Sequence, residues 1–263
     1  MTEKILLESY PDGVTVLMFN RPQARNALDL ESMRLFAETV SCLREDAGLR
    51  VVVLTGAGEQ AFCSGGDLVE LSNYPSEADA INMITLMGDA LLTLERLPVP
   101  VIAAINGYAL GGGSEIALAC DMRIVDEAVQ LGLVQIRLGL TPGWGAGQRL
   151  LRVVGYARAM DLLLRGHVLH ASEIEELGLA NRIVEQGSAL PQALRVARQI
   201  AAAPPDTVRG VKALLQAGMN HPYEMALQIE RAVFPPLWAA EPHLKAVNDF
   251  LNRRKSPDSD TES

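Results

Sequence analysis

Two glycine-rich stretches of the chain could aim backbone N–H groups at one point. They are Ser64-Gly65-Gly66-Asp67 and Gly111-Gly112-Gly113-Ser114-Glu115. Each follows an apolar run typical of a buried strand, and each precedes a helix-like pattern. Backbone N–H groups at the start of a helix have no partner within it and carry partial positive charge. Two of them pointing at one atom can stabilise an oxyanion, although the same glycines are also compatible with ordinary tight turns.

An acid ends the second stretch, and Glu115 is therefore the first candidate for proton transfer. A carboxyl beside a bound substrate can act as a general acid or base. The helix dipole also favours an acid in the first turn of a helix, so capping is the competing interpretation. Capping needs no glycine-walled pocket beside the acid, and the triple glycine therefore favours proton transfer.

Other kinds of site are disfavoured by their sequence context. The segment Gly56–Ala61 fits the dinucleotide-binding fingerprint, but no helix pattern follows it. His167 and His170 could share a helix face, but no third ligand lies near them, so we expect no metal site. Cys63 has no histidine near it in the sequence, and we expect it to pack as a small apolar side chain.

Composition limits the kinds of partner. The chain has 263 residues, of which 49% are hydrophobic, enough for one large domain or for a domain with a small appendage. Its formal net charge is −9, and it has no basic stripe, so we expect no nucleic-acid partner. Any site for an anionic ligand must therefore be built locally.

The sequence lacks the usual patterns of a signal peptide, a membrane span and a disulfide framework. The first residues have no apolar core of signal-peptide length, and no window approaches the about 18 apolar residues of a membrane span. Three scattered cysteines are too few for a disulfide framework. We therefore expect a cytoplasmic protein without a membrane partner. The acidic tail, 256–263, is expected to be disordered.

The pattern of the first half alternates strand and helix. Apolar runs predict strands at 14–19, 51–54, 99–105 and 122–125, and helices are expected at 29–43, 78–97 and 114–119. This alternation is typical of an α/β fold with a largely parallel sheet. After Gly145 the pattern changes to helices, at 145–154, 156–164, 172–178, 188–202, 205–218 and 221–238. We expect a core over 1–190, a helical region over 191–255 and the tail.

These motifs, in this order, resemble the crotonase, or enoyl-CoA hydratase/isomerase, superfamily. The matching stretches cover nearly the whole chain: Asn20–Leu28, Phe62–Leu68, Ile105–Gly113, Cys120-Asp121, Gly139–Gly143, Gly178-Leu179 and Phe250–Lys255. The resemblance implies a spiral of ββα units with a helical C-terminal trimerisation region, forming a homotrimer or a dimer of trimers (a homohexamer). It also implies a lyase or isomerase of fatty acid metabolism that acts on an acyl-CoA thioester. Coenzyme A is then part of the substrate, and no separate cofactor is expected.

The resemblance also assigns roles to individual residues. It places the two N–H donors for the thioester oxygen on Gly66 and Gly112, which agrees with the chemistry inferred from the loops. The path of the coenzyme A moiety would be lined by Ser64, Asp67, Leu68 and Val69. Arg25 stands where a basic residue meets the phosphates of coenzyme A. Phe234 and Arg253 stand where hydratases reach the coenzyme A of a neighbouring subunit.

One residue departs from the pattern of the hydratases. Those enzymes use two glutamates; the first corresponds to Glu115, and the position of the second holds Gln135. Hydration needs a base for water and an acid for the α-carbon, and glutamine cannot exchange a proton at neutral pH. A single acid/base suffices to isomerise a double bond, or to protonate the enolate left by decarboxylation or retro-aldol cleavage. Gln135 could also be a structural hydrogen-bonding residue.

Trp144 is the second departure, because hydratases have a small residue at its position. Trp144 could reshape the acyl pocket, or it could be a packed core residue. A similar Gly-Trp-Gly stretch occurs in decarboxylases of this family that act on methylmalonyl- or ethylmalonyl-CoA.

The leading prediction from the sequence is a hydratase/isomerase-like enzyme with Glu115 as its one acid/base. The alternatives are an acyl-CoA decarboxylase and a CoA-ester binding protein with weak catalysis. The acyl group and the pathway are left open.

Overall fold

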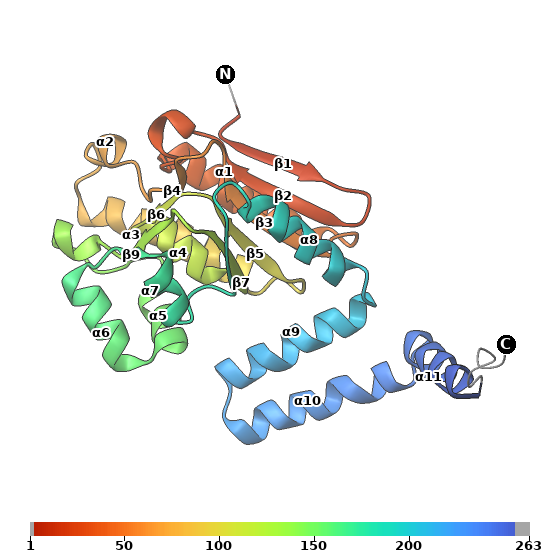
Figure 1. Cartoon of the computed structure of the whole chain (residues 1–263). Helices are drawn as coiled ribbons and strands as arrows, with labels where there is room; N and C mark the ends of the chain where they lie inside the picture. Colours follow the sequence, from red (N-terminus) through yellow and green to blue (C-terminus); the bar gives the residue numbers. More distant parts are fainter. Residues whose placement is uncertain (1–2, 256–263) are drawn as a thin grey trace. The chain divides into compact units, whose positions relative to one another are not determined.

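The computed structural model describes residues 3–255. The chain divides into two compact units, one ending at Ala202 and the other starting at Ala203. The predicted tail at 256–263 lies outside the described residues. Figure 1 shows the order of the elements along the chain.

A six-stranded sheet is the centre of the first unit. Its strand order is β1-β2-β3-β5-β7-β10, with bounds Ile5–Ser9, Val14–Phe19, Val51–Gly56, Val101–Ile105, Met122–Asp126 and Arg182–Val184. The edge pair β1–β2 is antiparallel, and every other neighbouring pair is parallel. The predicted α/β class with a largely parallel sheet is therefore confirmed.

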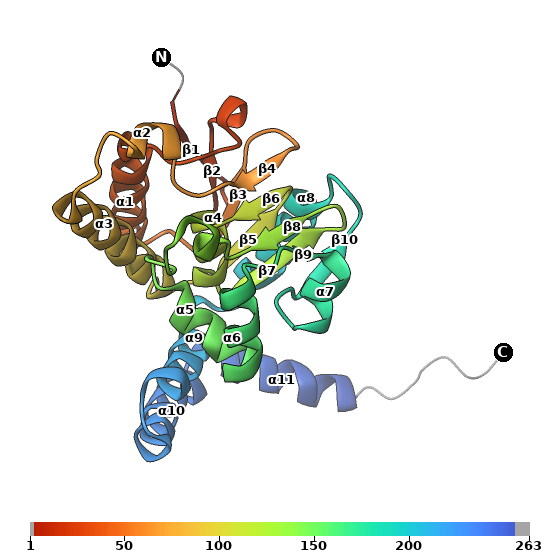
Figure 2. The same ribbon diagram turned by 90° about the vertical axis from the view of Figure 1, so that its left-hand side faces the viewer.

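A second sheet of short strands lies beside the first; its strands were not among those predicted from apolar runs, although the family resemblance implied ββα units. It consists of β4 (Ala61–Cys63), β6 (Tyr108–Leu110), β8 (Gln130–Gly132) and β9 (Leu169–His170), in that order (Figure 2). Each of β4, β6 and β8 follows a strand of the large sheet, so the chain repeats a strand–strand–helix unit. The glycine-rich stretches begin directly after β4 and β6.

Alternation along the strands separates two apolar cores. One face of the large sheet presents side chains such as Leu17, Val52 and Leu54 to the main core, which contains apolar faces of α1 (Leu30–Glu45), α3 (Glu77–Glu95) and α4 (Gly112–Ala119). The opposite face presents Val14, Val16, Val51, Val53, Ile102, Ala104 and Ile124 to α8 (Ala189–Ala201). Helix α8 meets this face with alanines spaced four residues apart, at 189, 193, 197 and 201. This spacing places small side chains on one face of the helix.

The remaining helices of the first unit are short. They are α2 (Leu68–Leu71), α5 (Ala146–Val154), α6 (Tyr156–Arg165) and α7 (Ala171–Glu176), with single 3-10 turns η1 (Pro22–Ala24) and η2 (Gln135–Leu138). Apart from α2 and the 3-10 turns, these helices agree with the segments predicted from periodicity.

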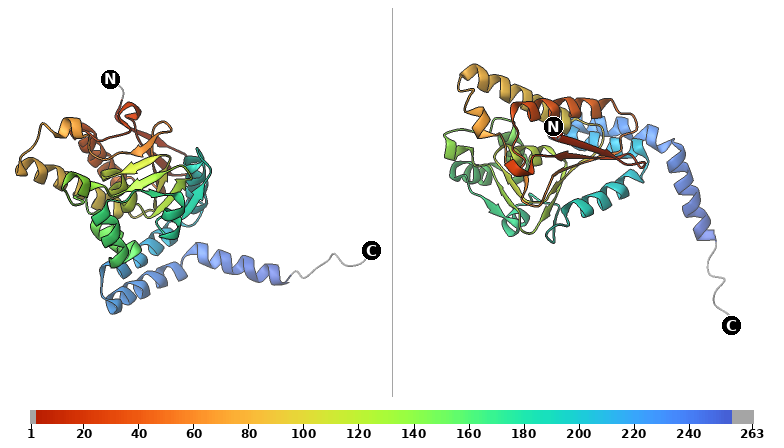
Figure 3. Two further views of the ribbon diagram at one scale, coloured as in Figure 1. Left: turned by 60° about the vertical axis from the view of Figure 1, so that its left-hand side comes forward. Right: turned by 90° about the horizontal axis from the view of Figure 1, so that it is seen from above.

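The second unit is helical throughout. It contains α9 (Pro205–Asn220), α10 (Tyr223–Trp238) and α11 (Glu241–Lys255); α11 lies within the expected helical region 191–255, although no separate helix was predicted there. Helices α9 and α10 form an antiparallel hairpin (Figure 3), in which Gly210 faces Val233 and Leu237. Among the described residues, no helix has both the length and the apolar character needed to cross a membrane.

Candidate active site

The two glycine loops lie against each other because the strands before them are paired. Strands β4 and β6 are parallel neighbours, so the loops leave the same edge of the small sheet. A Cβ atom added at Gly65 would lie 2.8 Å from the backbone nitrogen of Gly112. A Cβ atom at Gly113 would overlap the carbonyl group of Cys63. Glycine is needed at both positions because the backbones approach too closely for a side chain.

Backbone pairing leaves the N–H group of Gly66 free. Leu28 donates a hydrogen bond to the Gly65 carbonyl (2.8 Å) and accepts one from the N–H of Asp67 (2.9 Å). In this parallel bridge, the N–H of the middle residue, Gly66, points away from Leu28. Gly112 is the first residue of α4, so its N–H has no partner within the helix. Within residues 3–255, neither N–H donates a hydrogen bond to another protein group.

Glu115 follows Gly112 by one turn of α4 and is 2% exposed. Its carboxylate does not cap its own helix; it lies at the start of α5. Oε2 accepts hydrogen bonds from the N–H groups of Trp144 (2.7 Å) and Ala146 (3.1 Å). Oε1 accepts from the N–H of Gly143 (3.3 Å) and from Nε2 of Gln135 (2.8 Å). Burial raises the pKa of the Glu115 carboxyl above its usual value, and these hydrogen bonds oppose part of that shift.

Gln135 belongs to η2, and only one of its two polar side-chain atoms forms a hydrogen bond. Its Nε2 donates to Glu115, as described above. Its Oε1 is buried and has no hydrogen-bond partner among the described residues. A buried acceptor without a partner costs free energy, so this oxygen is suited to a donor brought by a ligand or a water molecule.

Trp144 is 5% exposed, and its indole ring occupies the place where a side chain at Gly112 would lie. The ring therefore packs on the second glycine loop, as part of the main core.

Arg149 fixes the backbone of the turn that contains Trp144, because its Nη1 donates to the Trp144 carbonyl (2.8 Å) and its Nε to Glu95 (2.9 Å). Sequence reasoning missed Arg149, since an arginine on an amphipathic helix usually faces solvent.

The residues predicted along the first loop do lie together. Asp67 caps α2 by accepting from the N–H groups of Val69 (3.2 Å) and Glu70 (3.4 Å). Leu68 and Val69 are both exposed. The N–H of Ser64 donates to the Arg25 carbonyl (3.1 Å). The Arg25 guanidinium lies over the ring of Tyr108, with 5.9 Å from Cζ to the ring centroid. Their binding roles remain predictions.

Phe234 and Arg253 lie in the second unit. Phe234 is exposed on α10, where its ring stacks near that of Trp238 with 5.7 Å between centroids. Arg253 is exposed on α11. Their predicted contact with a neighbouring subunit remains a prediction.

The residues of the metal, nucleophile and dinucleotide sites that the sequence disfavoured have other surroundings in the structure. His167 Nε2 lies 2.8 Å from Glu173 Oε1, and His170 is the N-cap residue of α7. No cluster of three potential metal ligands occurs in the described part of the chain. Burial raises the pKa of the Cys63 thiol to about 12, which disfavours the thiolate that a nucleophilic cysteine needs. Strand β4, rather than a helix, begins at the last residue of Gly56–Ala61, so the dinucleotide fingerprint has no helix to bind pyrophosphate.

The chain is similar to proteins of one known family. The sequence model of the enoyl-CoA hydratase/isomerase family matches residues 9–260. The chain belongs to the enoyl-CoA hydratase/isomerase family. It is 34% identical over 254 residues to a crotonyl-CoA hydratase of Syntrophomonas wolfei, covering 97% of both chains. It is also 34% identical to a short-chain-enoyl-CoA hydratase of Clostridium acetobutylicum, covering 92% of both.

Solved structures of the enoyl-CoA hydratase/isomerase family agree with the fold. The crystal structure of an enoyl-CoA hydratase from Bacillus anthracis matches with a TM-score of 0.90 at 34% identity, covering 95% of this chain and 97% of the other. The strand–strand–helix repeat described above is thus the crotonase fold, as the sequence motifs predicted. The protein is an enzyme of this hydratase/isomerase type.

Proposed function

We propose that the protein shifts or hydrates the double bond of an enoyl-CoA thioester through an enolate, with Glu115 as its one acid/base. The observation that carries this proposal is a buried carboxyl with a raised pKa one helical turn from the free N–H of Gly112, in the loop that packs against Gly65-Gly66. The free N–H groups of Gly66 and Gly112 would hold the thioester oxygen. One such donor is worth about 3 kcal/mol of transition-state stabilisation.

Isomerisation needs only the groups that the site has. The Glu115 carboxylate removes a proton from the α-carbon of a 3-enoyl thioester, and the electron pair of the broken C–H bond moves toward the thioester oxygen. The two N–H groups stabilise the negative charge on that oxygen. Protonated Glu115 then returns the proton to the γ-carbon, which gives the 2-enoyl thioester and restores the carboxylate.

Hydration uses Glu115 twice. Water adds to the β-carbon while Glu115 takes its proton, and Glu115 then protonates the α-carbon of the enolate. The unpartnered Oε1 of Gln135 would accept a hydrogen bond from the attacking water. Because Gln135 holds the water without taking its proton, we expect hydration to be slower than isomerisation.

Decarboxylation of a malonyl-type thioester is the second candidate, and the raised pKa of Glu115 favours it. Loss of carbon dioxide leaves the enolate of a saturated acyl thioester at the same two N–H groups, and a protonated acid must then deliver a proton to its α-carbon. A CoA-ester binding protein is the third candidate.

The deciding experiment measures turnover of crotonyl-, 3-enoyl-, methylmalonyl- and ethylmalonyl-CoA by the wild type and by Glu115→Gln, Glu115→Asp and Gln135→Glu. We expect Glu115→Gln to lower kcat on the active ester by about 100-fold or more, and Glu115→Asp to lower it less. Gln135→Glu should raise crotonyl-CoA hydration. Circular dichroism and thermal melting check that the variants are folded.

Full turnover by Glu115→Gln would contradict the acid/base role. Tight binding of several esters without turnover of any would favour the binding protein. Turnover of the malonyl esters alone would favour the decarboxylase.

The remaining features of the proposal concern binding and assembly. We propose that Arg25, Ser64, Asp67, Leu68 and Val69 contact coenzyme A, with Trp144 bounding the acyl group. Phe234 and Arg253 would contact the coenzyme A of a neighbouring subunit in a homotrimer or a dimer of trimers. We propose a cytoplasmic enzyme of fatty acid metabolism that needs no metal or separate cofactor.

A further inference from the structure

We propose that Arg21 is a positioning residue that aims the N–H of Gly66 into the active site. Nothing in the sequence patterns assigned Arg21 a role of its own. The inference rests on the proposed function in one respect, because it takes Gly66 as an oxyanion donor.

The direction of the Gly66 N–H is set by the segment that runs beside it. Leu28 pairs with the backbone on both sides of Gly66, through the Gly65 carbonyl and the Asp67 N–H. The N–H of Ser64 also donates to the Arg25 carbonyl. The first glycine loop therefore takes its position from backbone pairing with the segment 25–28, which we call the template. Whatever shifts this segment also turns the N–H of Gly66.

The template contains two residues whose backbone conformation is unfavourable and must be held by other contacts. Arg25 and Asn26 both have positive φ angles, 52° and 55°, which are unfavourable for residues with a side chain. Asn26 is 1% exposed, and its Nδ2 donates to the carbonyls of Ala57 (3.0 Å) and Ala61 (2.7 Å). Its Oδ1 accepts from the backbone N–H of Arg21 (2.9 Å). The backbone of Arg21 thus helps to hold the strained turn.

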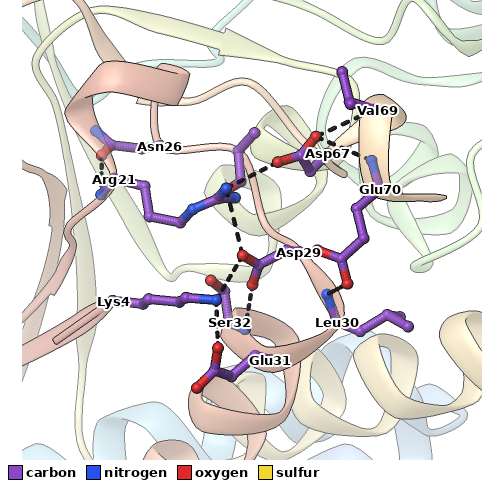
Figure 4. A network of polar contacts seen from close by, with 11 residues as sticks. Lys4, Arg21, Asn26, Asp29, Leu30, Glu31, Ser32, Asp67, Val69 and Glu70 are labelled. Carbon is purple, nitrogen blue, oxygen red and sulfur yellow. Dashed lines mark hydrogen bonds and ion pairs between the residues drawn. The ribbon is translucent and has the colours of Figure 1, made fainter. Parts of the chain in front are cut away.

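The side chain of Arg21 then joins the template to the loop (Figure 4). Its Nη1 donates to the carbonyl of Ala27, in the template, at 2.6 Å. Its Nη2 donates to Oδ2 of Asp67, in the loop, at 2.9 Å, and lies 3.4 Å from Asp29 Oδ2. Oδ1 of Asp67 caps α2, so Asp67 is held from both sides. One guanidinium therefore joins the backbone of the template, at Ala27, to the side chain of Asp67 in the loop, directly beside the Leu28–Gly66 bridge.

The geometry requires arginine rather than a generic cation. Two different nitrogens of the planar guanidinium reach two different segments at the same time, and a lysine offers all its donors from one nitrogen. The Arg21 side chain is only 17% exposed, so solvent screens these interactions weakly. An oxyanion donor must lie within a few tenths of an ångström of its ideal place, and a misplacement of about 1 Å can cost about 100-fold in rate. Loss of Arg21 should therefore act on kcat through Gly66.

The test compares Arg21→Lys and Arg21→Met with Lys4→Met as the matched control. Lys4 pairs with Asp29 and Glu31 in the same polar network but touches neither glycine loop. Three quantities are measured for each variant: kcat and KM on the most active thioester, the melting temperature, and hydrogen–deuterium exchange of peptides covering residues 64–68 without substrate.

We expect Arg21→Lys to lower kcat by about 10- to 100-fold with KM changed less than about threefold, and to speed exchange of the 64–68 peptides. Lys4→Met should leave kcat and this exchange within about twofold of the wild type. Added methylguanidinium should restore part of kcat to Arg21→Met, which a general loss of stability would not permit.

Normal exchange in both Arg21 variants would overturn the anchoring role, whatever the kinetics. Faster exchange with unchanged kcat would leave Arg21 as an anchor and contradict the oxyanion role of Gly66. The exchange measurement needs no turnover, so it tests the inference even if none of the four thioesters is a substrate.

Discussion

At the scale of single residues, the proposed function depends on the protonation state of Glu115. Its carboxyl sits 2% exposed against the start of α5 and receives four hydrogen bonds, three of them from backbone N–H groups. Burial favours the neutral acid, whereas the N–H donors favour the carboxylate, and burial dominates. Glu115 can therefore change its protonation state closer to neutral pH than an exposed glutamate does.

The first prediction at this scale concerns pH. The pKa of Glu115 is raised from its usual 4.5, so the inflection that it contributes to kcat/KM should lie above pH 4.5. If Glu115 starts the reaction as a base, the rate rises with pH through this inflection because the carboxylate is the active form. If it acts as the acid of a decarboxylase, the rate falls through the same inflection.

The measurement is a pH–rate profile on each thioester that turns over, with Gln135→Glu as a second enzyme. A new carboxyl 2.8 Å from Glu115 should move the inflection further up, since two like charges at this distance cannot both form easily. An inflection at or below pH 4.5 in the wild type would contradict the assignment.

At the scale of elements, the approach of α4 to β4 creates the site. The first turn of α4 lies on the backbone of β4 so closely that a Cβ at Gly113 overlaps the Cys63 carbonyl. The same approach sets Gly112 beside Gly65. Arg21 and Leu28 then hold the other loop, through Asp67 and Gly66, against the segment that precedes α1. The two N–H donors are thus placed by elements from three separate parts of the chain.

We predict that Gly113→Ala destabilises the fold by about 2–3 kcal/mol, because the contact is with backbone that cannot yield. The matched control is Gly88→Ala, in the middle of α3. A Cβ at Gly88 meets nothing within 4 Å, and alanine there should stabilise the helix by about 0.5–1 kcal/mol. Urea unfolding at one fixed protein concentration measures both. Equal stability of the two variants would mean that α4 does not approach β4 this closely.

At the scale of the whole molecule, the two units differ in how completely they bury their apolar side chains. The first unit has two extensive cores. In the second unit, α10 has no buried residue, and large apolar side chains are exposed on all three helices, among them Leu215, Phe234, Trp238, Phe250 and Leu251. An apolar helical surface of this kind favours association with further copies of the chain.

We predict that the protein has three or six times the mass of one chain in light scattering after size exclusion. Leu215→Asp and Phe250→Asp together should shift it toward a single chain, because a buried unpaired carboxylate opposes association. Leu7→Asp, at an exposed position of β1 in the first unit, is the control and should leave the mass unchanged. A wild-type protein that elutes with the mass of one chain would contradict the proposed assembly.

The sequence by itself determined the class of the fold, most of the long elements and the pair of glycine loops. Strands such as 14–19 and helices such as α1, with its Asp29 cap, are encoded by local periodicity and capping, which act over a few residues. The motifs also indicated the family, because glycine pairs that follow strand-like runs can be recognised in the sequence itself.

The tertiary structure decided what local patterns cannot encode. Strands β4, β6 and β8 have three residues each, too few to show a period, and they form through pairing with one another. The partners of Glu115 come from residues 135–146, and those of the loop around Gly66 come from residues 21–28. Burial and backbone N–H groups from distant segments set the pKa of Glu115 and the direction of Gly66. Only the folded chain brings these segments together, so the candidate site around Glu115 and Gly66 exists only in the tertiary structure.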